Sequence, residues 1–320
     1  MDFGAADNGA MIATRAVHFA ATATVTGTLV FRAVVANPVL RSREAAAKTF
    51  RTQTQRVAWI SLAVAVISGL TWVLLVTMSL SGESVGEAVM SGAVRDVLNL
   101  TQFGLVSEIR AGLAIVLAAC LVAQGRFPLA ERIALATALG LAAAIAWTGH
   151  AASTPGVEGN LHLAADALHV LAAAAWIGGL VSLVLLLAVI SKIPPMPGAA
   201  LAQDVAQRFS TLGMLSVAIL VLSGTVNSWI LVGSFDGLFA DEYGRLLILK
   251  LIIFAFMLAF AAVNRFWLTP RLAVSSANTG QSEALRQLTR NSAIEIALGL
   301  AIFAVVGLLG TLHPAAHLVK

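Results

Sequence analysis

Long apolar stretches, separated by short polar or charged connections, recur along the whole chain. Most of them reach the roughly 20 residues that a helix needs to cross a hydrocarbon core about 30 Å thick. The pattern predicts an all-α, polytopic membrane protein with eight spans: Ala10–Val35, Val57–Leu80, Leu105–Gln124, Ile133–His150, Leu161–Ile190, Val205–Val232, Leu246–Trp267 and Ser292–Leu312.

The composition of the 320-residue chain agrees with this pattern. Hydrophobic residues make up 59% of the chain and charged residues only 11%. Soluble domains contain roughly 45–50% apolar and about 25% charged residues. A soluble protein is therefore excluded, and the lipid bilayer is the expected surrounding of most of the chain.

The connections between the apolar stretches alternate in their charge. Basic residues gather after each odd-numbered span, whereas the opposite connections carry mostly acidic residues. By the positive-inside rule, the basic connections face the cytoplasm and both termini lie outside it. The formal net charge of +4 then reflects membrane topology, and no nucleic-acid partner is expected.

The two halves of the chain resemble each other. The clearest match is between RAVHFAATATVTG in the first half and DALHVLAAAAWIG in the second, and further matches follow in the same order. The alignment pairs His18 with His169, Gly27 with Gly178, Ser68-Gly69 with Ser223-Gly224, and Arg110 with Lys250. The alignment predicts two four-helix units, 1–155 and 156–320, that form one membrane domain. Because four is even, both units enter the membrane in the same direction, and the site is expected where they meet. The Ser-Gly pairs are interpreted as close-packing positions.

The stretch LHLAADALHV, residues 161–170, carries unusual polarity for a membrane span. His162, Asp166 and His169 fall within an arc of about 60° on one helix face. Titratable groups inside a membrane are costly and usually functional. Imidazole and carboxylate suit divalent copper, zinc or nickel, so the stripe predicts a metal site.

The other candidate metal ligands are histidines on the same predicted side of the membrane. His18 lies at the depth of His169 by the repeat, and His150 and His313 close the fourth and eighth spans. Each has a simpler interpretation, because a lone membrane histidine often only hydrogen-bonds a neighbouring helix. The predicted metal ligands are, in order, His169, His162, Asp166, His18, His150 and His313.

Charged residues inside the spans raise further alternatives. Asp166 aligns with Arg15, so these two residues are expected either to form an ion pair or to leave Asp166 orienting a histidine. Arg110 and Lys250 are expected either to line the same outward-facing vestibule or to extend outward to the membrane surface, and we favour the second. Glu295, near the predicted inner start of the last span, is the intramembrane carboxylate expected on that side.

No nucleotide-binding signature occurs in the chain. Movement of a metal is therefore expected to be passive or coupled to an ion gradient, and no enzyme activity is expected.

Several phrases in the second half resemble the copper resistance protein D family: LHLAADALHVLAAAAWIGGL, RFSTLGMLSVAILVLSGTVNSWI, YGRLLILKL, NRFWLTPRL and GLLGTLHPA. The resemblance implies a bacterial inner-membrane protein of copper uptake or resistance, which moves copper across the membrane or receives it at the periplasmic side. It also implies a periplasmic copper-binding partner of the CopC type. The resemblance selects copper over zinc and nickel, and the imidazole and carboxylate ligands favour Cu²⁺ over Cu⁺.

Haem b is the alternative cofactor. Histidines at matched depth in two four-helix units, such as His18 and His169, could ligate a haem between them. The chain would then be an electron-transfer protein or a membrane oxidoreductase. Against this alternative, His162 and His169 share one helix, whereas two haem ligands usually face each other across a bundle.

Overall fold

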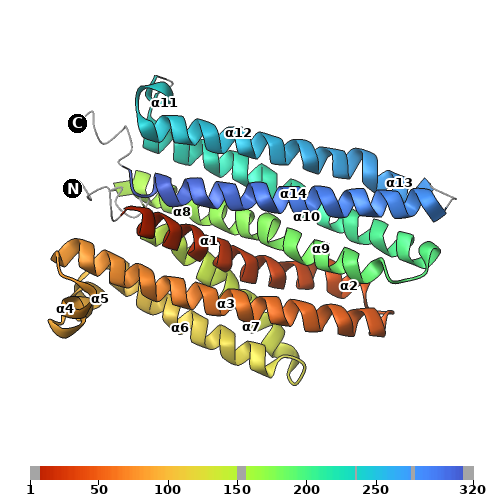
Figure 1. The fold of residues 1–320 in the computed structure, drawn as a ribbon, viewed down its shortest axis with the longest axis horizontal. Helices are drawn as coiled ribbons and strands as arrows, with labels where there is room; N and C mark the ends of the chain where they lie inside the picture. The colour runs from red at the N-terminus through yellow and green to blue at the C-terminus, as the bar shows by residue number, and fades with distance from the viewer. Residues whose placement is uncertain (1–7, 150–155, 235, 275–277, 313–320) are drawn as a thin grey trace.

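The computed structural model describes residues 8–149, 156–234, 236–274 and 278–312. Most residues in these ranges are helical, and the long helices run side by side as an elongated bundle (Figure 1). In the described ranges, eight helical segments are long and apolar enough to cross a membrane: Gly9–Val39, Glu44–Ser81, Gln102–Ala123, Leu129–Thr148, Gly156–Ile190, Met196–Val232, Glu242–Leu272 and Ser282–Leu309. The predicted all-α fold with eight spans is confirmed.

The first four spans are built from the N-terminal half of the chain. They comprise α1 (Asn8–Phe31) with a π-helical turn, η1 (Arg32–Ala36), and α2 (Asn37–Val39), then α3 (Glu44–Ser81), α6 (Gln102–Ala123), and α7 (Pro128–Ala143) with the 3₁₀ turn η2 (Ala144–Thr148). Two short helices, α4 (Val85–Met90) and α5 (Ala93–Leu100), connect α3 to α6.

The C-terminal half supplies the other four spans. They comprise α8 (Gly156–Ala173), the π-helical η4 (Ala174–Gly178) and α9 (Gly179–Ile190), then α10 (Pro195–Val232), then α12 (Glu242–Val263), π-helical η5 (Asn264–Leu268) and α13 (Thr269–Val274), and finally α14 (Asn278–Leu309). The short helix α11 (Gly237–Ala240) precedes α12.

Several helices begin well before the residue that the apolar pattern predicts, and the last of them, α14, starts at Asn278 instead of Ser292. The helix α3 starts at Glu44 instead of Val57, and α10 starts at Pro195 instead of Val205. The added turns of both α3 and α10 contain Ala and Gln, and those of α3 also contain Lys and Arg, all residues with high helix propensity. The apolar pattern therefore marks the part of a helix that lies in lipid, and the helix itself continues into the basic connection.

The same devices link the second and third spans of each half. Glycines in the left-handed conformation end α3 at Gly82 (φ 72°) and α10 at Gly233 (φ 73°), as is common at helix ends. Thr101 then caps α6 and Asp241 caps α12, each side chain accepting from the glycine N–H three residues later. The α3–α6 and α10–α12 connections thus both begin at a left-handed glycine and end at a side-chain cap.

The two ends of the bundle differ in what they carry. At one end α1 begins, α14 ends and the short helices α4, α5 and α11 lie (left in Figure 1). We call this the terminal end. The opposite end, which we call the basic end, holds the connections α2–α3, α6–α7, α9–α10 and α13–α14 (Figure 1).

The halves meet where α1 crosses the span that contains η4. A side chain at Gly27 would collide with the Ala174 carbonyl oxygen and the Gly178 backbone, and one at Gly178 would collide with the Ala23 carbonyl oxygen. The two backbones are therefore in direct contact, as small residues allow in membrane helices. This crossing places α1 and the α8–η4–α9 span at the centre of the molecule.

Candidate metal site

A cavity of about 550 Å³ opens among α1, α8, α10, α12 and α14 toward the terminal end. We call it the terminal cavity. Most of its wall is apolar, and its charged, imidazole, phenol and amide groups are Arg15, His162, Asp166, His169, Asn227, Tyr243 and Lys250. The structure thus places all three residues of the predicted stripe on the wall of one cavity.

His169 is held by α10. Its Nδ1 lies 3.0 Å from Ser223 Oγ, and the Ser223 hydroxyl donates to the Ile219 carbonyl oxygen at 2.6 Å. Because the serine proton is used in that bond, Oγ accepts from His169 Nδ1–H, and Nε2 carries the lone pair. Within the described ranges, Nε2 has no hydrogen-bond partner, so His169 offers the cavity a metal-binding nitrogen.

Oxygen ligands lie on the same wall. Asn227 Nδ2 donates to Asp166 Oδ1 at 3.2 Å, which holds the carboxylate, and the buried Asn227 Oδ1 has no partner among the residues that the structure describes. Lys250 is close enough for its charge to act on both Asp166 and His169. An imidazole, a carboxylate and an amide side chain thus line a space large enough for an ion.

The remaining predicted ligands are placed differently. His162 is 1% exposed and lies on the cavity wall. In the part of the chain that the structure describes, no three His, Cys, Asp or Glu side chains are close enough to hold one metal ion. The stripe therefore does not offer all of its three side chains to a single ion in this conformation. His150 and His313 lie outside the described residues.

His18 does not line the terminal cavity. Its Nδ1 donates to the Ala65 carbonyl oxygen and contacts Ser68 Oγ, both at 3.0 Å, and its Nε2 accepts from Arg110 Nη2. The imidazole is 4% exposed. The structure does not bring it together with His162, Asp166 and His169, and both of its nitrogens are already used.

The surroundings of His18 and His169 correspond residue by residue. Ser68 and Ser223 each contact the Nδ1 of their histidine, and Gly69 and Gly224 each lie against its ring. The difference lies in what covers the ring. In the first half Trp72 packs 5.5 Å from His18, ring centre to ring centre, and Phe103 packs 5.4 Å from Trp72. By the repeat alignment, the polar Asn227 and Tyr243 stand at these two positions in the second half, where the cavity lies.

The expected ion pair between Arg15 and Asp166 is not formed. Arg15 Nη1 donates to the Gly310 carbonyl oxygen at 2.9 Å, and its guanidinium lies 5.0 Å from the Trp72 ring centre. Asp166 is instead bonded to Asn227. Both charges border the terminal cavity, but Arg15 is held by Gly310 of the second half and Trp72 of the first, whereas Asp166 is bonded within its own half.

Arg110 and Lys250 do not extend outward as expected. Arg110 is 7% exposed and donates to His18 and, at 2.9 Å, to the Leu141 carbonyl oxygen. Lys250 lines the terminal cavity. Arg110 lies inside the bundle with a histidine and a carbonyl as partners, which lowers the cost of its burial. Lys250 lies near enough to Asp166 for the two charges to interact.

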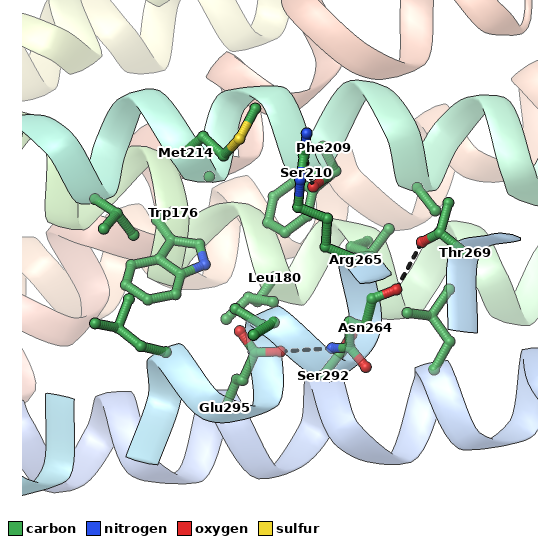
Figure 2. Close-up of a pocket in the computed structure, with 18 of the residues that line it drawn as sticks. Trp176, Leu180, Phe209, Ser210, Met214, Asn264, Arg265, Thr269, Ser292 and Glu295 are labelled. Atoms are coloured by element: carbon green, nitrogen blue, oxygen red, sulfur yellow. Dashed lines mark hydrogen bonds between the residues drawn. The ribbon is translucent and has the colours of Figure 1, made fainter. Parts of the chain in front are cut away.

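Another cavity, of about 330 Å³, lies in the half toward the basic end, among η4, α9, α10, η5 and α14. We call it the distal cavity. Figure 2 shows Trp176 at one side and Glu295, Asn264 and Ser292 along another. Of these four residues, the sequence singles out only Glu295, as an intramembrane carboxylate. Its polar neighbour Asn264 comes from another span, and the signal that could have found it is the presence of an asparagine within an apolar stretch.

Comparison with protein families supports the sequence resemblance over most of the chain. Residues 5–160 match the family model described as the copper resistance protein D-like N-terminal domain, and residues 203–309 match the model described as copper resistance protein D. No solved structure matches the chain significantly.

Curated relatives from three bacteria are similar to the chain. It is 30% identical to the copper resistance protein D of Pseudomonas syringae pv. tomato over 85% of this chain and 86% of that protein. It is 31% identical to the copper transport protein CutJ of Bacillus subtilis (strain 168), over 78% of this chain but only 44% of that protein. It is 28% identical to the inner membrane protein YebZ of Escherichia coli (strain K12), over 95% of this chain and 98% of that protein. The haem alternative finds no support among these relatives.

Proposed function

Because the chain belongs to the copper resistance protein D family, we propose that it moves copper across the bacterial inner membrane and that the terminal cavity receives the ion. The family and the eight spans give a multi-pass inner-membrane protein with a copper-related function. The proposal adds the site of copper entry, the residues that hold the ion and the passage of copper through the bundle.

One observation carries the proposal: His169 presents an unpaired Nε2 to the terminal cavity, within the described ranges, while Ser223 fixes its ring through Nδ1. A metal-binding histidine typically has this arrangement, with one nitrogen on the metal and the other on a fixed partner. The corresponding His18 has Arg110 on its Nε2 instead. The two imidazoles are thus arranged alike, but Nε2 faces a cavity in the second half and accepts from Arg110 in the first.

The other wall residues adjust the charge of the cavity. The Asp166 carboxylate attracts a cation, and Asn227 Oδ1 adds a neutral oxygen. Lys250 opposes a cation in the empty cavity and neutralises Asp166 there. Imidazole and carboxylate favour Cu²⁺ over the other divalent ions of the first transition row, because copper stands highest in the affinity order.

The proposal also gives the terminal end a partner. If the basic connections are cytoplasmic, the terminal cavity faces the periplasm. A periplasmic copper-binding protein of the CopC type is then the proposed donor of the ion. The donor would dock over the terminal end of the bundle.

Copper uptake by lipid vesicles tests the proposal. Purified protein is reconstituted, copper is added outside, and copper retained in the washed vesicles is measured by atomic absorption. We expect uptake by the parent protein, and for His169→Gln a fall of about tenfold or more, because the metal ligand is lost. His18→Gln is the matched control, since it changes the corresponding imidazole in the first half, where Nε2 already accepts from Arg110.

Uptake by His169→Gln at the parent rate would place copper entry elsewhere. Vesicles containing the parent protein that take up no more copper than empty vesicles would contradict transport itself.

A further inference from the structure

The distal cavity contains a buried carboxylate. Glu295 on α14 is 2% exposed, and its Oε1 accepts from Asn264 Nδ2 at 2.7 Å. Asn264 Oδ1 in turn accepts from Asn291 Nδ2 at 3.0 Å. In Figure 2 the bond between Glu295 and Asn264 is drawn along the cavity wall. Two asparagines thus fix the carboxylate at one side of the cavity.

The Glu295 carboxyl has no cationic partner within the described ranges. Among the ion pairs of the described residues, none includes Glu295. Arg265, which also lines the cavity, donates to Ser210 Oγ at 2.6 Å. A buried carboxylate without a counter-ion is costly, and inside a membrane it usually marks an ion pathway.

An unpartnered hydroxyl lies on the same wall. Ser292 precedes Glu295 by three residues on α14, so both side chains share one helix face. Ser292 is fully buried, and within the described ranges its Oγ has no hydrogen-bond partner. The thioether of Met214 lines the cavity as well. Carboxylate, hydroxyl and thioether together form a mixed oxygen and sulfur donor set.

Trp176 lies between the two cavities. Its side chain is 2% exposed and borders both the terminal and the distal cavity. The indole packs edge-on against Phe254, with ring centres 6.1 Å apart. Trp176 belongs to the π-helical η4, and Asn264 begins the π-helical η5. Such π-helical turns are frequent at functional sites.

From this geometry we propose that the distal cavity is a second copper site, with Glu295 as its anionic ligand, which is filled from the terminal cavity past Trp176. This inference deepens the proposed function and rests on it for the route of the ion. A cation bound there would pair with the Glu295 carboxylate and give a partner to the Ser292 hydroxyl, which has none in the described ranges.

Copper binding in equilibrium dialysis tests the distal site without any need for transport. The background is His169→Ala, which removes the terminal ligand, and copper is supplied alone as Cu²⁺ or, with ascorbate, as Cu⁺. We expect the His169→Ala protein to keep a weaker copper-binding phase. Adding Glu295→Gln is expected to lower the affinity of that phase by about tenfold or more, whereas adding Glu295→Asp retains the carboxylate and much of the binding.

Glu108→Gln is the control for removal of a carboxylate, because Glu108 lies exposed on α6 and borders neither cavity. Copper binding that is unchanged when Glu295→Gln is added, in monodisperse protein, overturns the proposal. If Glu295→Gln does not fold, Ser292→Ala is added to the His169→Ala background instead, and its copper affinity is compared in the same way. This change removes a hydroxyl without a partner in the described ranges. A lower affinity supports the site, and an unchanged affinity overturns it. Vesicle uptake decides the proposed function separately.

Discussion

Individual side chains decide which of the two histidines can hold a metal. His18 and His169 are both oriented by a serine one helix away. What differs is the group at Nε2: Arg110 donates to His18, whereas His169 faces a cavity. The availability of an imidazole nitrogen in this protein therefore depends on its neighbours and not on its depth in the membrane.

The orientation of His169 by Ser223 leads to a matched prediction. Ser223→Ala removes the hydroxyl that accepts from Nδ1–H, so the ring is held less firmly, and the dissociation constant for copper should rise by about tenfold. Ser68→Ala removes the corresponding contact of His18. It should leave copper binding unchanged and cost about 1 kcal/mol of stability. Copper titration and thermal unfolding of both variants in detergent check the pair; equal copper affinities would contradict a role for Ser223.

At the scale of elements, the crossing of α1 with the α8–η4–α9 span organises the bundle. The sequence alignment predicts that Gly27 and Gly178 are equivalent, and the structure shows that these equivalent residues touch. Contact between equivalent residues is what a two-fold arrangement requires at its axis. It supports the predicted duplication of units 1–155 and 156–320, which stays a prediction.

A methyl group at this crossing should be poorly tolerated. Gly178→Ala would collide with the Ala23 carbonyl oxygen, so the helices must separate, and we expect a loss of about 1–3 kcal/mol in the free energy of unfolding. Gly112→Ala is the matched control, because Gly112 lies in α6 with open space around its Cα. That change should be neutral or stabilise the protein by up to about 1 kcal/mol. Thermal unfolding in detergent compares the two, and equal stabilities would show that the crossing is not tight.

For the whole molecule, the sequence is a good guide to the spans because lipid leaves few alternatives to long apolar helices. It also predicts residues that line the terminal cavity, since His162, Asp166 and His169 are close together in the chain. It could not show that Trp72 and Phe103 cover His18, or that Arg15 turns to the Gly310 carbonyl oxygen instead of Asp166. Those outcomes depend on how separate helices pack, which a periodic pattern does not record. The distal cavity stayed hidden for the same reason.

The direction in which the molecule crosses the membrane is testable. The basic connections should be retained in the cytoplasm, so both ends of the chain should lie in the periplasm. A reporter that is active only in the cytoplasm should be silent when fused after Lys320. The same reporter inserted after Lys192, in the connection between α9 and α10, should be active. The reverse result would turn the terminal cavity toward the cytoplasm.

The most direct test of copper binding in the terminal cavity is a copper titration of the purified protein with a single imidazole removed. His169→Ala should lower copper affinity by more than about tenfold, because Nε2 supplies a ligand to the cavity. His18→Ala should bind copper as the parent does, provided that it remains folded, because Arg110 already occupies its Nε2. Parent-like affinity in His169→Ala, with loss of binding in His18→Ala, would contradict copper binding at the terminal cavity.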